Sequence, residues 1–167
     1  MWARDIQKDY GQQEYGPFGQ NWGYGSSPLL YEDSLYVEVL HGMHTKDPSF
    51  ILRIDNKTGK TLWRVERPSP AFRESPDAYN TPAIYKDAKR TELIITGGDV
   101  ITGHDLATGK ELWRGTGFNP TDRRDFRVIA SPLIYDGMVY APTRNKPLLA
   151  FQLARADGTA VMAAGAT

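Results

Sequence analysis

Three short patterns in this sequence contain residue types that could perform chemistry. His41 and His44 could bring two imidazoles to one metal ion, but zinc requires three or four ligands and no clear third ligand accompanies them. The Gly-Lys-Thr tripeptide at 59–61 resembles the end of a phosphate-binding loop, although that loop needs a glycine where Ile54 stands. The Gly-Gly pair at 97–98 lacks the strand-turn-helix setting of a dinucleotide-binding loop. The sequence therefore predicts no metal site and no catalytic residue in these patterns.

The Gly-Lys-Thr tripeptide belongs to a segment that occurs twice. Residues 55–64 read Asp-Asn-Lys-Thr-Gly-Lys-Thr-Leu-Trp-Arg and residues 105–114 read Asp-Leu-Ala-Thr-Gly-Lys-Glu-Leu-Trp-Arg, so seven of ten positions match at an offset of 50 residues. A Ser/Thr-Pro segment that ends in tyrosine occurs three times, at 27–31, 81–85 and 131–135. A fixed period of this length indicates repeated structural units, and the tripeptide is accordingly predicted to be a turn.

Short runs rich in β-branched and aromatic residues lie between these markers. They predict strands at 35–40, 50–55, 93–96, 100–105, 138–141 and 148–153. No stretch has a convincing helical period. Four antiparallel strands in each repeat are typical of a β-propeller blade. The predicted fold class is all-β, a partial β-propeller of about three four-stranded antiparallel blades with the last blade incomplete.

The period also divides the chain. Trp2 is predicted to end the fourth strand of a preceding blade, and no Leu-Trp-Arg follows the third strand of the last unit. The predicted segments are 1–26, the end of a preceding blade and a long connection; 27–66, a blade; 80–114, a blade; 127–153, an incomplete blade; and 154–167, an irregular tail. Closed propellers have about four to eight blades. The chain is therefore expected to be part of a larger disc, or to self-associate through its incomplete blade edges.

The repeated residues are expected to stabilise the fold. In the turn between the third and fourth strands, the Asp side chain can accept backbone N–H bonds and the Gly can adopt a positive φ. The Trp on the outermost strand has a large apolar face that one sheet cannot bury, so it is predicted to dock against the next blade. The predicted structural blade motif consists of Asp55, Thr58, Gly59, Trp63, Asp105, Thr108, Gly109 and Trp113.

One face of the disc is predicted to carry recognition. In an antiparallel blade the tight repeated turns lie on one face, and the long connections that do not repeat lie on the other. Aromatic, arginine and acidic side chains in these connections favour protein or peptide binding. The alternative is that they are solvated loops whose aromatic residues cover the top of the disc. The candidate binding face consists of Trp22, Tyr24, His41, His44, Arg73, Glu74, Asp77, Tyr79, Arg123, Arg124 and Arg144.

Charge and composition argue against several classes of function. Twenty Lys and Arg balance 20 Asp and Glu, so the sequence predicts no basic surface of the kind that nucleic acid or anionic lipid requires. The absence of cysteine excludes disulfides, zinc ribbons and thiol nucleophiles. No apolar run approaches the roughly 18 residues of a membrane-spanning helix, and the first residues do not form a signal peptide.

The spacing Asp-x-x-Thr-Gly-x-x-x-Trp, with Ser/Thr-Pro-apolar-apolar opening each unit, resembles the repeat of the PQQ-like (pyrroloquinoline-quinone-like) β-propellers over residues 22–153. That family includes quinoprotein dehydrogenases and the cofactor-free propeller lipoprotein of the bacterial outer-membrane barrel-assembly machinery. The resemblance implies a periplasmic or secreted location. The docking motif of the family usually begins with Ala, whereas this chain has Arg53 and Gly103 at that position.

For the dehydrogenases, the resemblance implies a quinone and a calcium ion at the propeller axis, with acidic and Asn ligands and a disulfide of adjacent cysteines. This chain has no cysteine, and Glu74, Asp77 and Asn80 are candidate oxygen donors by residue type alone. The sequence therefore favours a non-catalytic protein-binding or scaffold module without a cofactor, whose partner is a protein or peptide. The alternative is a fragment of a PQQ- and calcium-dependent alcohol dehydrogenase.

Overall fold

The computed structural model describes residues 1–12, 24–43, 45–143, 148–153 and 161–162. One short helix precedes a chain made almost wholly of strands, and each strand follows a turn signal in the sequence. The elements are α1 (Ile6–Tyr10), β1 (Leu29–Tyr31), β2 (Ser34–Val39), β3 (Phe50–Asp55), β4 (Thr61–Glu66), β5 (Ala83–Lys86), β6 (Thr91–Gly97), β7 (Val100–Asp105), β8 (Glu111–Gly115), β9 (Leu133–Tyr135), β10 (Met138–Pro142), β11 (Leu148–Gln152) and β12 (Val161–Met162).

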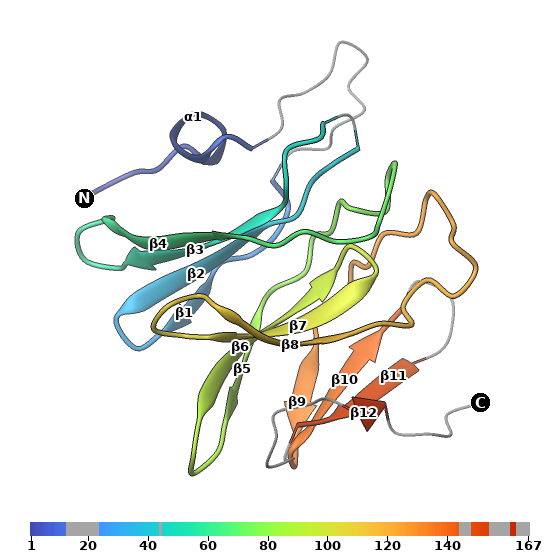
Figure 1. Cartoon of the computed structure of the whole chain (residues 1–167). Coiled ribbons are helices and arrows are strands. Elements are labelled where there is room, and N and C mark those ends of the chain that lie inside the picture. Colours follow the sequence, from blue (N-terminus) through green and yellow to red (C-terminus); the bar gives the residue numbers. More distant parts are fainter. Residues whose placement is uncertain (13–23, 44, 144–147, 154–160, 163–167) are drawn as a thin grey trace.

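The strands form three antiparallel four-stranded sheets in simple up-and-down order. The first sheet has the order β1-β2-β3-β4, the second β5-β6-β7-β8 and the third β9-β10-β11-β12. Figure 1 shows the sheets fanning out in sequence order, with α1 beside the first sheet and the third sheet at the opposite end. This arrangement confirms the predicted all-β, partial β-propeller fold, and we call the sheets blades 1, 2 and 3. Two of the predicted strands, 50–55 and 100–105, have the observed bounds of β3 and β7.

Hydrophobic side chains fill both interfaces between successive blades. At the first interface, Tyr36 and Ile51 of blade 1 pack against Leu93 and Ile95 of blade 2. The second interface is formed by Tyr85, Ile94, Ile101 and Trp113 of blade 2 and by Val139, Ala141, Leu149, Phe151 and Leu153 of blade 3. Burying one large apolar side chain contributes about 1.5–3 kcal/mol. The core of the protein is therefore the set of contacts between blades.

The two ends of the chain differ from a regular blade. The outermost strand of blade 3, β12, has two residues, whereas β4 has six. It nevertheless pairs with β11, inside a segment that was predicted to be irregular. Trp2 is not in a described strand and lies in the segment that precedes α1. Asp5 caps α1 by accepting hydrogen bonds from the backbone of the first turn, and Gly11 ends the helix at φ 78°, so the local chain is helical.

Candidate functional site

The repeated turn between the third and fourth strands is held by its own side chains. The Asp55 Oδ1 atom accepts hydrogen bonds from the Thr58 amide at 2.7 Å and from the Thr58 hydroxyl at 2.6 Å. Asp105 accepts the same two bonds from Thr108 at 2.8 and 2.6 Å. These bonds lower the pKa of both carboxyl groups, with the Thr hydroxyl as the largest cause. The side chains of the repeated Asp and Thr therefore fix the turns that join the third and fourth strands.

The two repeated tryptophans dock in different ways. Trp63 of blade 1 donates from Nε1 to the Leu106 carbonyl of blade 2 at 3.1 Å, and its ring lies against Gly109. Trp113 instead donates to the Glu92 carboxylate of its own blade at 2.6 Å, and its indole lies directly over Gly103. Both rings belong to the hydrophobic clusters between blades. The difference follows from the residue opposite the tryptophan on the neighbouring strand. Trp113 lies opposite Gly103, and its indole occupies the space that a side chain at Gly103 would need.

A buried arginine links blade 1 to blade 2. Arg67, at the end of β4, is fully buried and donates hydrogen bonds to the Thr102 hydroxyl at 2.8 Å and to the Gly97 carbonyl at 3.0 Å. Its other terminal nitrogen donates to the carbonyls of Ile95 and Val100 at 3.3 and 3.1 Å. Burial lowers the pKa of Arg67 to about 10, but this value is still well above neutral pH and the guanidinium remains charged. This side chain fixes the end of the β6–β7 hairpin against the connection that leaves blade 1.

The long connections assemble into one surface, which we call the loop face. The connection from β4 to β5 and the connection from β8 to β9 meet through the hydrogen bond from the Glu74 amide to the Arg124 carbonyl at 2.9 Å. The Ser75 hydroxyl donates to the Arg123 carbonyl at 2.8 Å, and Arg127 pairs with the Glu74 carboxylate at 2.9 Å. Segments about 50 residues apart in the chain therefore hold each other in place on this face.

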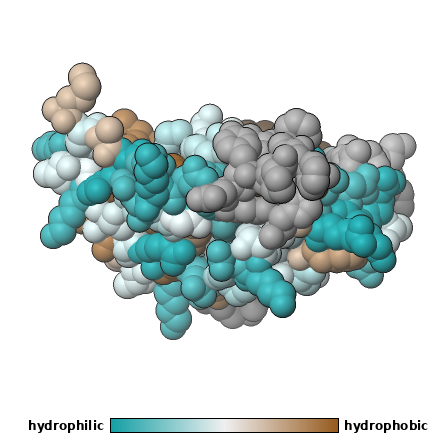
Figure 2. Space-filling view, turned by 90° about the horizontal axis from the view of Figure 1, so that it is seen from above, coloured by the Kyte–Doolittle hydropathy of each residue, from teal (hydrophilic) through white to brown (hydrophobic). Residues whose placement is uncertain are grey.

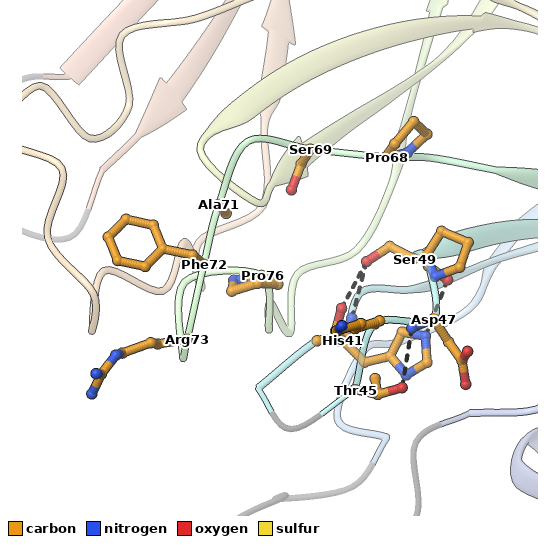
Figure 3. Close-up of a pocket in the computed structure, with 13 residues that line it drawn as sticks. His41, Thr45, Asp47, Ser49, Pro68, Ser69, Ala71, Phe72, Arg73 and Pro76 are labelled. Carbon is orange, nitrogen blue, oxygen red and sulfur yellow. Dashed lines mark hydrogen bonds between the residues drawn. The ribbon is translucent and has the colours of Figure 1, made fainter.

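A cavity of about 410 Å³ opens on the loop face. Figure 3 shows His41, Thr45, Asp47 and Ser49 along one wall, with residues of the β4–β5 connection along the other. The two ends of the first wall are joined, because the His41 amide donates to the Ser49 hydroxyl and that hydroxyl donates back to the His41 carbonyl, both at 3.1 Å. The lining residues of the second wall are Pro68, Ser69, Ala71, Phe72, Arg73 and Pro76. The cavity thus lies between connections that leave two different strands of blade 1.

An aromatic ring and unpaired cations surround this cavity. Phe72 is 40% exposed, and the Arg124 guanidinium lies 5.8 Å from the centre of its ring. Arg73 has a φ of 55°, a left-handed conformation that is uncommon for a residue with a side chain. Among the residues that the structure describes, Arg73, Arg124 and Lys46 make no ion pair. Their positive charges are therefore available to a ligand.

The predicted binding residues divide into those at the cavity and those behind it. His41 and Arg73 line the cavity and Arg124 stands beside it, whereas Arg123 is paired with Asp125 at 3.0 Å. Glu74, Asp77 and Tyr79 lie near Arg127. Burial raises the pKa of Asp77, and the positive charge of Arg127 reduces this rise. Tyr24 belongs to the cluster on the outer side of blade 1, where burial raises its pKa. Trp22, His44 and Arg144 lie outside the described residues.

His41 has a structural environment in the described chain. Its Nε2 atom lies 3.2 Å from the Pro48 carbonyl, and its ring meets the Phe50 ring edge-on. Burial lowers the pKa of His41, so the neutral imidazole is favoured at neutral pH. Within the described ranges, no group of three His, Cys, Asp or Glu side chains could hold a metal ion. His41 therefore shapes the wall of the cavity and is not in a metal-binding cluster of that kind.

The three candidate calcium donors have different partners in the structure. Glu74 is paired with Arg127 at 2.9 Å, and the same cation also acts on the Asp77 carboxylate. Asn80 points its amide nitrogen at the Thr96 carbonyl and hydroxyl, at 2.7 and 2.8 Å. The Asn80 Oδ1 atom, which is the potential calcium ligand of that side chain, is buried without a hydrogen-bond partner among the described residues. Calcium binding by these three residues therefore stays the alternative prediction.

Sequence reasoning missed four residues that organise this region. Arg67 and Arg127 hold the connections in place, and Glu38 is a fully buried carboxyl on the blade 1 side of Arg67. Phe72 is the exposed aromatic ring beside the cavity. None of the four belongs to a repeated motif, but Phe72 directly precedes Arg73 in a connection that does not repeat, and this position could have identified it.

Hydrophilic residues dominate the side of the molecule seen in Figure 2, where the coloured hydrophobic residues are scattered. No helix among the described residues is both long enough and apolar enough to cross a membrane.

Comparisons with known proteins place this geometry in context. The family model described as "Outer membrane protein assembly factor BamB" matches residues 17–163. The solved structure of BamB from Moraxella catarrhalis is similar at 22% identity and a TM-score of 0.51, over 80% of this chain and 38% of that one. Quinohemoprotein alcohol dehydrogenase from Comamonas testosteroni is similar at 18% identity and a TM-score of 0.59, over 84% of this chain and 20% of that one. A search of curated proteins found no match.

The chain thus spans well under half the length of either solved structure. Likeness at this level of identity shows a shared fold, and the function must be argued from the residues themselves.

Proposed function

Because the chain belongs to the family described as outer membrane protein assembly factor BamB, we propose that it is a non-catalytic segment of a protein-binding propeller. The proposed ligand is an extended, acidic segment of a partner protein that binds across the cavity on the loop face. The observation that carries this proposal is the cavity between two connections of blade 1, flanked by an exposed aromatic ring and by cations that make no ion pair among the described residues.

The charges around the cavity favour carboxylates over other groups. Lys46 and Arg73 line the cavity, and Asp47 is the one acidic residue among the described residues of its lining. The neighbouring acids Glu74 and Asp125 are already paired with arginines, at 2.9 and 3.0 Å. The net positive charge that remains would attract an anionic chain during encounter and orient it over the cavity.

The shape of the region favours a peptide chain with apolar side chains. The Phe72 ring and the prolines at 48, 68 and 76 provide apolar walls between polar groups. Buried aromatic and arginine contacts dominate the affinity of protein interfaces, because water is excluded from them. An apolar side chain of the partner would fill the cavity, while its flanking carboxylates would meet the Arg73 and Arg124 guanidinium groups.

A location in the cell envelope is part of this proposal and is supported by the printed description of the family. A cofactor is not part of it, because the Glu74 carboxylate is already paired with Arg127 and no group of three His, Cys, Asp or Glu side chains in the described ranges could hold a metal ion. The alternative activity, quinone-dependent alcohol oxidation, would require saturable binding of the quinone and calcium by the purified chain.

The test uses fluorescence anisotropy with a labelled peptide in which Asp and Glu alternate with Leu and Phe. The matched probe has Asn and Gln in place of the acids. We expect the acidic peptide to bind with a Kd that rises with salt, and we expect Arg73→Glu or Phe72→Ala to weaken binding about tenfold or more. Lys110→Glu is the control, because it makes the same charge change on an exposed turn of the opposite face. Equal binding of both peptides, or equal loss in the control variant, would refute the proposal.

A further inference from the structure

The outer face of blade 3 is apolar and uncovered. Leu133, Tyr135 and Leu148 are 64, 72 and 52% exposed, which makes them three of the most exposed large hydrophobic residues described. The strand register places them on one face of the sheet together with Met138 and Tyr140, because Tyr135 pairs with Met138 and Leu133 pairs with Tyr140. The described side chains of this blade 3 outer face are Leu133, Tyr135, Met138, Tyr140, Pro142, Leu148, Ala150 and Gln152. None of them carries a charge.

The repeat shows what this face does in the other two blades. Leu148 occupies the register position of Ile51 in blade 1 and Ile101 in blade 2. Each lies four residues before the last third-strand residue that pairs with the second strand, which is Gln152, Asp55 and Asp105 respectively. Ile51 and Ile101 are both 0% exposed, because the next blade packs on them. Tyr135 likewise corresponds to Tyr85, which is 4% exposed at the interface with blade 3. The blade 3 outer face therefore has the composition of a sheet-docking surface, and no sheet among the described residues packs on it.

The opposite end of the fan is already covered by the chain itself. Trp2, Ile6 and Tyr10 pack on the apolar side of blade 1 that faces away from blade 2. Trp2 donates from Nε1 to the Asn56 carbonyl at 3.0 Å and lies on Gly59, as Trp63 does at the equivalent turn of blade 2. The N-terminal segment thus occupies the place where another blade would dock. A second copy could not pack its blade 3 on this end without displacing that segment.

We propose that the blade 3 outer face binds the same face of a second copy of this chain, in a two-fold symmetric dimer. A large exposed apolar patch on a soluble protein marks an interaction site. A face without charge is complementary to itself, because no like charges meet across the two-fold axis. Blade-to-blade packing already occurs twice in the chain through equivalent positions, so this interface uses a contact that the sequence forms elsewhere.

The first test measures the oligomeric state by light scattering coupled to size exclusion, over a range of concentrations. The unmodified chain should be a dimer, and Leu148→Glu should raise the dimer Kd about 100-fold or more, because each protomer would bury a carboxylate. Circular dichroism should show that the variant keeps its sheets. The matched control is Leu112→Glu, since Leu112 is 49% exposed on the outermost strand of blade 2 and should leave the dimer intact. A monomer at every concentration, or equal effects of both variants, would overturn the proposal.

The second test distinguishes a symmetric dimer from head-to-tail assembly. The chain has no cysteine, so a single introduced thiol reports its own position. Ala150→Cys lies near the middle of the blade 3 outer face and should give a covalent dimer with a short bismaleimide, because the same residue approaches its copy across a two-fold axis. Ala107→Cys, on an exposed turn of blade 2, should remain uncross-linked. Ladders of higher oligomers, or equal cross-linking at both positions, would contradict a two-fold arrangement.

Discussion

Replacing Arg67 tests whether the buried guanidinium couples blade 1 to blade 2. Arg67→Met keeps a long side chain and removes the charge together with its four hydrogen bonds, which span 2.8 to 3.3 Å. Removing one partner from a buried charged network costs about 3–5 kcal/mol, because the groups left behind are desolvated and unpaired. We expect the free energy of unfolding to fall by about this amount.

The buried carboxyl of Glu38 determines how that loss depends on pH. Burial raises the pKa of Glu38 well above its usual range, and the positive charge of Arg67 opposes this rise. Without Arg67, the ionised carboxylate has lost its nearest compensating charge. When the pKa of a carboxyl is higher in the folded state than in the unfolded state, the free energy of unfolding rises as the pH falls and the carboxyl takes up its proton. The cost of Arg67→Met should therefore be largest at high pH and should shrink as the pH falls through the folded pKa of Glu38.

The assay is urea unfolding followed by tryptophan fluorescence and circular dichroism. Arg64→Met is the matched control, because Arg64 is exposed on the same strand and only its contact with the Phe50 ring, at 4.2 Å, would be lost. That change should cost about 1 kcal/mol or less. Adding Glu38→Gln to Arg67→Met should recover about 1–3 kcal/mol relative to the sum of the single changes. A cost below about 1 kcal/mol for Arg67→Met, or a strictly additive double variant, would refute this account of the interface.

Two further predictions follow from buried contacts in blade 2. Gly103→Ala should destabilise the fold by about 2–4 kcal/mol, because the new Cβ would overlap Trp113 Nε1 and displace its hydrogen bond. The cost, measured by thermal unfolding, should shrink in a Trp113→Phe background. Burial lowers the pKa of His104 to about 4, so the unfolded state takes up a proton before the folded state does and stability should fall by about 2 kcal/mol between pH 7.5 and pH 5. Protonation of Glu38 changes stability in the opposite direction over pH. The contribution of His104 is therefore measured as the difference in unfolding free energy between the unmodified chain and His104→Gln. Parallel profiles of unfolding free energy against pH for the two proteins would contradict the prediction.

Much of the fold could be predicted because its signals are local and repeated. The bonds that hold the Asp55 turn lie within three residues of one another, so composition and spacing were sufficient to predict a turn there. Strands β3 and β7 begin with apolar residues and end at an Asp that opens a turn, and their bounds were predicted correctly. A repeat then implied that these strands form blades that pack on one another. The short helix α1 was missed because five residues with one capping side chain carry no detectable period.

The candidate site was only partly predictable, because it depends on contacts between distant segments. The sequence indicated that the long connections share a face, but nothing local shows that Arg127 pairs with Glu74 or that Phe72 remains exposed beside a cavity. The same limit applies to His41, which the sequence placed on the candidate binding face. The environment of its ring depends on how residues around Pro48 fold back, which brings the Pro48 carbonyl beside Nε2.

The sequence by itself determined the period, the strands, the turns and the need for blade-to-blade packing, since these follow from local residue types and their spacing. The tertiary structure decided how each repeated residue is used. Trp63 reaches the next blade, whereas Trp113 turns to Glu92, because Gly103 leaves space for its indole. Packing also decided that Trp2 covers one end of the fan while Leu148 is exposed at the other. The physical reason is that burial and hydrogen-bond partners are properties of the whole arrangement, and identical motifs acquire different neighbours within it.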